Sequence, residues 1–105
     1  MIGNRTRIAG LAAAAVALGL TTGAMAADFD AGWAAYQKGE FAAALKEWQP
    51  LADSGDKRAQ FNLGLMYDEG RGVSQDRKQA LAWWEKSANQ GYAQAQHNLA
   101  LAYIF

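Results

Sequence analysis

Glycine and acidic residues gather in one stretch of the chain, where they could bind a phosphate or a metal ion. Gly70-Arg71-Gly72 resembles the start of a phosphate-cradling loop, but Gln75 occupies the place of the third glycine of a dinucleotide fingerprint. Asp68, Glu69 and Asp76 flank this loop without the alternating oxygen ligands of an EF-hand. We therefore expect a turn between helices, with Asp68 and Glu69 solvated at a helix end, Asp76 as a helix cap, and no metal.

Nucleophiles and general bases are scarce in the chain. It has no cysteine, which excludes a thiolate nucleophile, a disulfide and a cysteine-ligated metal. His97 is the only histidine, and no motif places beside it a side chain that could orient it for acid–base work. No serine sits in a G-x-S-x-G nucleophile pattern. The sequence therefore predicts no catalytic residue and no cofactor, and we expect a protein that is not an enzyme.

The charge balance argues against nucleic acid as a partner. Ten lysine and arginine residues face ten aspartate and glutamate residues in a chain of 105 residues. A nucleic-acid surface needs a clustered excess of basic side chains. Alanine and leucine are abundant and there is one proline, a bias that favours helices over strands. The length suits one ordinary domain.

The first 26 residues have the pattern of an export signal. Arg5 and Arg7 precede an apolar run over residues 8–20, and Ala24-Met25-Ala26 fits a small-x-small cleavage site. The apolar run is short and interrupted by glycine, so cleavage is favoured over retention as a membrane anchor. Loss of Arg5 and Arg7 leaves 8 basic and 10 acidic residues, a net charge of −2. We expect a periplasmic or secreted protein that meets a membrane only during export.

The strongest signal is an internal repeat with a period of 36 residues. When residues 44–69 are compared with residues 80–105, 11 of the 26 positions are identical. In the first copy the identical residues are Ala44, Leu45, Trp48, Ala52, Gly55, Ala59, Gln60, Asn62, Leu63, Leu65 and Tyr67. A period in this range is typical of solenoids, in which supersecondary units stack on their neighbours.

Each unit is predicted to consist of two helices. Apolar residues at spacings of three and four indicate a helix over residues 58–69, which Gly70-Arg71-Gly72 ends. Asp76, followed three residues later by Gln79, has the pattern of a capping box. The helix that it begins runs to about Gln90, and Gly91 closes it. A further first helix is predicted over residues 93–105.

The earlier segment follows the same plan with a shorter turn. Helices are predicted over residues 29–38 and 41–54. Gly32 and Ala44 are 12 positions apart, whereas Gly64 and Ala80 are 16 apart, so four extra residues enter the loop near residues 70–75. Pro50 lacks an N–H and crowds the preceding turn, so we expect a kink or a 3₁₀ turn there.

The fixed residues of the central unit resemble the Sel-one-like repeat, a relative of the tetratricopeptide repeat. The resemblance runs along Ala59-x-x-x-Leu63-Gly64-x-x-Tyr67-x-x-Gly70-x-Gly72-Val73-x-x-Asp76-x-x-x-Ala80-x-x-x-Trp84-x-x-x-Ala88-x-x-Gly91. The first hairpin, with Tyr36-Gln37-Lys38-Gly39-Glu40-Phe41, is closer to a plain tetratricopeptide unit. The expected organisation is a signal peptide (1–26), a tetratricopeptide-like hairpin (27–56), a Sel-one-like repeat (57–92) and the first helix of an incomplete repeat (93–105).

This resemblance implies an all-α solenoid of about two and a half units, built as a right-handed superhelix of antiparallel helix pairs with a concave inner face. Proteins of this family usually assemble other proteins, often in bacterial envelope or signalling pathways, which implies an adaptor that holds a protein or peptide partner in its groove. Carried over through Leu63, Gly64 and Tyr67, the groove positions are Arg58, Phe61, Leu65, Asp68, Gln94, His97, Leu101 and Ile104. For Leu65 and Leu101, packing between repeats is the alternative.

Two further features concern apolar side chains that the repeat does not place in the core. Trp84 has Trp48 as its partner one period earlier, whereas Trp83 aligns with Glu47. We expect Trp83 either to contact a partner or to pack under the loop at residues 70–75. The last helix ends in Ala-Tyr-Ile-Phe where solenoids usually place a polar cap. We expect a fragment of a longer repeat protein, or an end that pairs with something, including self-association through the unpaired last helix.

Catalysis is the remaining alternative. Some cysteine-rich relatives in the family are associated with penicillin binding or β-lactam hydrolysis. The absence of cysteine removes the feature that would support this activity here. The adaptor hypothesis is therefore favoured over an enzyme and over a self-assembling structural protein.

Overall fold

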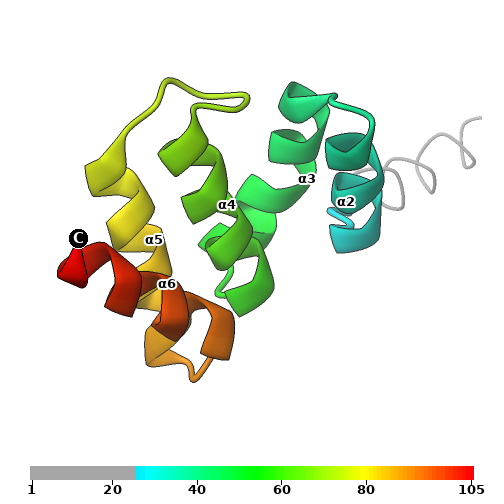
Figure 1. Ribbon diagram of the computed structural model, residues 1–105. Coiled ribbons are helices and arrows are strands. Elements are labelled where there is room, and N and C mark those ends of the chain that lie inside the picture. Colours follow the sequence, from blue (N-terminus) through cyan, green and yellow to red (C-terminus); the bar gives the residue numbers. More distant parts are fainter. Residues whose placement is uncertain (1–25) are drawn as a thin grey trace, which may run out of the picture.

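The computed structural model describes residues 26–105, and over that range the chain is entirely helical. Its helices are α2 (Phe29–Gln37), α3 (Phe41–Asp53), α4 (Lys57–Glu69), α5 (Arg77–Asn89) and α6 (Ala93–Ile104). Each packs on the next, and Figure 1 shows α2 to α5 in chain order from right to left, with α6 crossing the lower part of α5. The expected all-α repeat solenoid is confirmed. The predicted signal peptide lies almost wholly outside the described residues, among which no helix has the length and apolarity to cross a membrane.

Aspartate residues begin three of the helices. Asp28 and Asp56 each accept two backbone N–H hydrogen bonds from the first turn, and Asp76 accepts one from Gln79 at 3.1 Å. The capping box predicted here is only half formed. The backbone N–H of Asp76 donates to the carbonyl of Tyr67 at 2.8 Å, so it is not available to Gln79. The start of α5 is thereby tied to the end of α4.

The ends of α3 and α4 differ from each other. Gly70 ends α4 with φ of +69°, the left-handed conformation that glycine adopts readily, as predicted. Of the two alternatives expected at Pro50, the 3₁₀ turn is wrong, because α3 stays α-helical through Asp53, and the kink stays a prediction. Proline removes only one donor so near the end of a helix. The backbone N–H and the Oγ of Ser54 both donate to the Pro50 carbonyl, which closes the helix.

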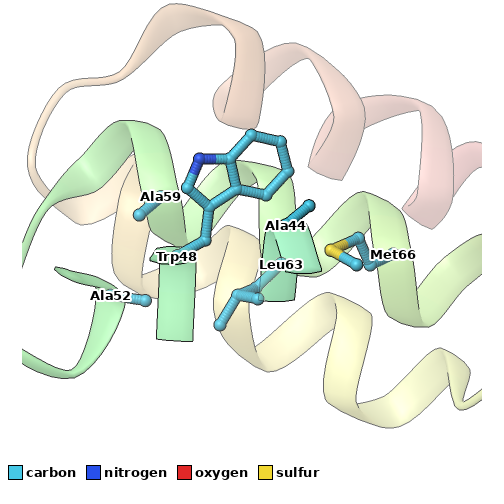
Figure 2. Packing of buried hydrophobic residues seen from close by; sticks show 6 residues of the cluster. All are labelled: Ala44, Trp48, Ala52, Ala59, Leu63 and Met66. Atoms are coloured by element: carbon cyan, nitrogen blue, oxygen red, sulfur yellow. The ribbon is translucent and has the colours of Figure 1, made fainter. Parts of the chain in front are cut away.

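The larger core cluster joins α3 to α4. Its buried members, drawn in Figure 2, are Ala44, Trp48, Ala52, Ala59, Leu63 and Met66. A smaller cluster of Ala80, Trp84 and Ala95 joins α5 to α6 and has half-buried side chains of α4 around it. Because α4 contributes to both clusters, it is the element that makes the two units one body.

The two units are built around the same contact between glycine and tryptophan. A methyl group on Gly32 would collide with the indole of Trp48, and one on Gly64 would collide with the indole of Trp84. Each indole N–H donates to a carbonyl three residues before the glycine, that of Phe29 at 3.1 Å and that of Phe61 at 3.2 Å. The glycine therefore lets each second helix lie close against its first helix.

Candidate partner-binding groove

A hollow of about 280 Å³ runs along the first helices of the units. It is lined by Phe29, Asp30 and Trp33 of α2, by Phe61, Asn62 and Leu65 of α4, and by Tyr92 and Gln94 at the start of α6. The residues of α2 and α4 are at equivalent positions of the two first helices, since Gly32 of α2 corresponds to Gly64 of α4. We call this hollow the α2–α4 groove.

Aromatic side chains form the walls of the α2–α4 groove and are held in place from behind. Trp33 is 44% exposed, although its ring stacks on that of Tyr36 with centroids 5.6 Å apart and planes 5° apart. It also lies against the buried Trp48, with centroids 6.2 Å apart. On the other side, the ring of Phe61 packs on that of Tyr92 at 5.4 Å. The groove therefore offers a preformed apolar surface whose rings need little reordering to bind a ligand.

The polar, non-aromatic side chains in the lining of the α2–α4 groove are Asp30, Asn62 and Gln94. Asp30 is exposed and lies in the first turn of α2. Asn62 is only 8% exposed. Among residues 26–105 every fully buried side-chain nitrogen or oxygen has a hydrogen-bond partner. No such bond joins the amide of Asn62 to another described residue, so that amide reaches the surface, and the surface that Asn62 lines is the groove.

The eight predicted groove residues are divided among several surfaces. Phe61, Leu65 and Gln94 line the α2–α4 groove. Leu65 also packs against the second core cluster, so both of its proposed roles apply. Arg58 lines a second hollow, and Asp68 and Leu101 line a third. His97 and Ile104 are exposed and line none of these three.

Arg58 lies in an adjoining hollow of about 400 Å³ between the start of α2 and the start of α4. Its guanidinium stands 4.1 Å from the centroid of the Phe29 ring and pairs with Asp56 at 3.3 Å. Partial burial alone would raise the pKa of Asp56, but hydrogen bonds from Arg58 and from the backbone N–H of Ala59, with the charge of Arg58, hold that pKa below its usual value. Arg58 is thus already engaged by its own chain.

Asp68 and Leu101 line a separate hollow of about 300 Å³ between α4, α5 and α6. Asp68 pairs there with Arg77 at 3.5 Å. Asn98, the residue equivalent to Asn62 one period later, lines the same hollow. The inner face is therefore two separate depressions, and the larger aromatic surface belongs to the one beside α2.

Sequence reasoning missed Phe29, Asp30 and Trp33, which make up the α2 wall of the groove. The period of 36 residues does not reach them, because the first turn is four residues shorter. Aligning Gly32 with Gly64 instead places Phe29 on Phe61, Asp30 on Asn62 and Trp33 on Leu65. That offset was the signal that could have found them.

Trp83, for which the sequence left either partner contact or packing near the loop open, packs within its own chain. It is half-buried against the first core cluster, as is Val73 of the loop between α4 and α5. The ammonium of Lys86 stands 4.7 Å from the centroid of a Trp83 ring. The side chain therefore contributes to holding the loop side of the fold.

The acidic residues beside the glycine loop are engaged in local contacts. Asp68 pairs with Arg77, Glu69 pairs with Arg71 at 3.3 Å, and Asp76 caps α5. Within residues 26–105 no three histidine, aspartate or glutamate side chains gather closely enough to hold a metal ion. These contacts agree with the structural roles predicted for the loop.

One serine–lysine pair does have a spacing used in catalysis, contrary to the expectation that no nucleophile pattern is present. Ser54 and Lys57 form a Ser-x-x-Lys sequence, the spacing of β-lactamases and penicillin-binding proteins. Ser54 follows the end of α3 and its Oγ donates to the Pro50 carbonyl at 2.9 Å. Lys57 begins α4 beyond Gly55, whose φ is +102°. The pair therefore spans a turn between two helices, and the serine hydroxyl donates its hydrogen bond to the last turn of the first helix.

Comparison with known families supports an interaction role. The model of the Sel1 repeat matches residues 57–92 and 93–105. A search of curated proteins gives no match to the chain. Sel1 repeats are generally scaffolds that mediate protein–protein interaction, and the family is typically non-catalytic. This match, together with the helical solenoid, assigns residues 57–105 to the Sel1-repeat family.

Proposed function

We propose that this protein is an exported, non-catalytic adaptor that binds a segment of a partner protein in the α2–α4 groove. The observation that carries the proposal is the exposed Trp33, supported by Tyr36 and Trp48, facing a groove that α4 and α6 also line. Large aromatic side chains that are exposed but held rigidly are favoured at protein interfaces, because binding costs them little conformational entropy.

Export follows from the signal pattern at the start of the chain. Cleavage after Ala26 would make Asp28, the N-cap of α2, the second residue of the mature chain. The adaptor would then act in the periplasm or outside the cell. Mass spectrometry of protein recovered from the envelope of the source cell tests this point, because a product that begins at Ala27 is expected.

Capture of a partner from that envelope tests the binding proposal. Tagged full-length protein is crosslinked in the source cell and recovered beside two variants. Trp33→Glu places a charge in the groove, and Ala34→Glu places the same charge on the next residue of α2, which is exposed and outside the groove. We expect capture to be lost with Trp33→Glu and kept with Ala34→Glu.

Trp33 is a better probe than Phe61, although both line the groove. The ring of Phe61 packs on Tyr92 and on the second core cluster, so Phe61→Glu would also unfold part of the molecule. Circular dichroism of the variants separates the two causes. Equal capture by the wild type and a folded Trp33→Glu variant would contradict the proposal.

Self-association is the second candidate, and the C-terminal half of α6 favours it. Leu101, Tyr103 and Ile104 are 43%, 65% and 69% exposed. Neighbouring apolar side chains of this size can pair with a second copy of the chain. Light scattering at rising protein concentration tests self-association. A dimer that the Ile104→Lys substitution converts to a monomer would support it, and a monomer at every concentration would contradict it.

A further inference from the structure

The α2–α4 groove has one charged residue in its lining, and that residue is Asp30. Asp30 is exposed, and within the described chain it forms no ion pair. Its backbone N–H bonds to Asp28, but its own carboxylate is left to solvent and to the groove. An exposed carboxylate beside an apolar surface can bind the cationic end of a ligand.

The surroundings of Asp30 reinforce its negative charge. Residues 27–56 contain six acidic and two basic residues, whereas the chain as a whole is balanced. Asp28 and Asp56 lie with Asp30 around the adjoining hollow. The cation there is Arg58, which is held by Asp56 at 3.3 Å and by the Phe29 ring at 4.1 Å. The mouth of the groove therefore has a negative potential that attracts basic ligands.

The groove also has the two other features that a peptide needs. Its walls are the aromatic rings of Trp33 and Phe61 with the side chain of Leu65, which can take one apolar side chain. Asn62 lines the groove although it is only 8% exposed, and no hydrogen bond joins its amide to another described residue. An amide has both donors and an acceptor, which matches a peptide backbone.

We propose that the α2–α4 groove selects peptide segments in which a leucine- or phenylalanine-sized side chain stands next to a lysine or arginine. The apolar side chain lies between Trp33 and Phe61, the cation meets Asp30, and Asn62 binds the peptide backbone. This inference rests on the proposed adaptor function and adds to it the chemical class of the partner segment.

Synthetic peptides test this selection directly. One set carries a central leucine or phenylalanine beside a lysine in a glycine–serine background, and a matched set carries glutamate in place of the lysine. Binding of the labelled peptides to purified full-length protein is measured by fluorescence anisotropy. The wild type should prefer the lysine set by about tenfold, an effect of the size of one surface charge contact, and the preference should shrink as salt is added.

Two substitutions separate the roles of Asp30 and Asn62. Asp30→Lys should reverse the preference, so that glutamate peptides bind more tightly than lysine peptides. Asp53→Lys, which reverses an exposed charge at the end of α3 outside the groove, should leave the preference unchanged. Asn62→Leu should weaken both peptide sets by a similar factor, because it removes a backbone contact and leaves the charge in place.

The outcomes distinguish this inference from the adaptor function on which it rests. Equal binding of the two sets, a preference for glutamate, or no binding of any peptide at millimolar concentration would overturn the inference. The adaptor function would still stand if a partner were captured in the cell and lost with Trp33→Glu. If Asp30→Lys reverses the preference and Asp53→Lys does not, the proposed selection is established.

Discussion

Helices α4 and α6 have closely related sequences but different surroundings. Six of their residues are identical at a separation of 36, among them Leu63 and Leu99. Nevertheless, α4 buries six residues between α3 and α5, whereas α6 buries only Ala95 and has its main contacts with α5. In a repeat protein, the same residue therefore contributes according to the helices on either side of it, and sequence identity alone does not set its energetic role.

The largest difference is expected between the paired leucines. Leu63 is fully buried in the first cluster, so Leu63→Ala should reduce the free energy of unfolding by about 3–5 kcal/mol. Leu99 is half-buried at the edge of the second cluster, and Leu99→Ala should cost about 1–2 kcal/mol. Urea denaturation of the two variants measures both values. Equal losses would contradict the comparison.

Gly64 of α4 and the equivalent residue of α6 allow a second comparison between these two helices. Gly64→Ala drives a methyl group into the indole of Trp84 and should cost about 1–3 kcal/mol, although alanine favours helices. The equivalent residue of α6 is already an alanine, Ala100, and it is exposed. Ala100→Gly should therefore cost only the helix preference, about 1 kcal/mol.

A double variant serves as the control for Gly64. If the cost of Gly64→Ala comes from the collision, combining it with Trp84→Ala should cost less than the sum of the single variants. Additive losses in thermal or urea denaturation would show that the close approach of α5 to α4 has another cause.

The paired glutamines should differ by a smaller amount. Gln60 is 5% exposed, and its amide donates to the Ala52 carbonyl and accepts from Gln90. Gln60→Leu removes both bonds, while the Ala52 carbonyl keeps the backbone N–H of Gly55 and the Gln90 amide keeps the Gly55 carbonyl, so it should cost about 1–2 kcal/mol. Gln96 makes the equivalent bond to the Ala88 carbonyl at 3.2 Å, but in an exposed position. Gln96→Leu should cost about 0.5 kcal/mol or less, because water replaces the lost bond.

The start of α4 should respond to pH, because Asp56 caps it while Tyr92 at the start of α6 makes no side-chain cap bond. The pKa of Asp56 is lowered in the folded chain, so its contribution is present above the pKa of the unfolded chain and is lost as the pH falls through the folded pKa. Asp56→Ala should lose about 1 kcal/mol at neutral pH. The difference from wild type should narrow in acid, as denaturation at pH 7 and pH 3 would measure.

The smallest effect is expected at the end of α6. The hydroxyl of Tyr103 donates to Glu85 at 2.8 Å, and this bond, ahead of desolvation and the charge of Glu85, raises the pKa of the phenol. The contribution of the bond is present below the ordinary pKa of tyrosine and is lost as the pH rises through the raised value. Glu85→Gln should return the pKa of Tyr103 toward its ordinary value. The pKa of Tyr103 is measured from the rise of tyrosinate absorbance with pH, after the absorbance of the Tyr103→Phe variant is subtracted. If Glu85→Gln left this titration unchanged, the result would count against the bond.

The repeat made most of the fold predictable. The period of 36 residues placed Trp48 and Trp84 in the core and fixed the helix pairs, because each identity marks a position with the same neighbours. The 3₁₀ turn expected at Pro50 was wrong, since the distance of a proline from the end of its helix decides how much it disturbs that helix. The hydrogen bond from the Asp76 backbone N–H to the Tyr67 carbonyl joins two helices across a loop, so no local sequence pattern predicts it.

The site was less predictable than the fold. The positions carried over from the family pattern included Phe61, Leu65 and Gln94, which line the α2–α4 groove, but also Ile104, which is exposed and lies outside it. Trp33 and Asp30 were missed because the shorter first turn changes the offset from 36 to 32. A groove depends on which helices face each other, and that information is tertiary.

The most direct test of the groove uses a photo-crosslinking amino acid placed at single positions of the full-length protein in the source cell. Gln94 is exposed and lines the α2–α4 groove, whereas Asn89 is exposed at the end of α5 and lies outside it. We predict that the residue at position 94 crosslinks to a partner segment rich in basic and apolar residues, and that the residue at position 89 does not. Crosslinking from position 89 alone, or equally from both positions, would contradict a partner bound in this groove.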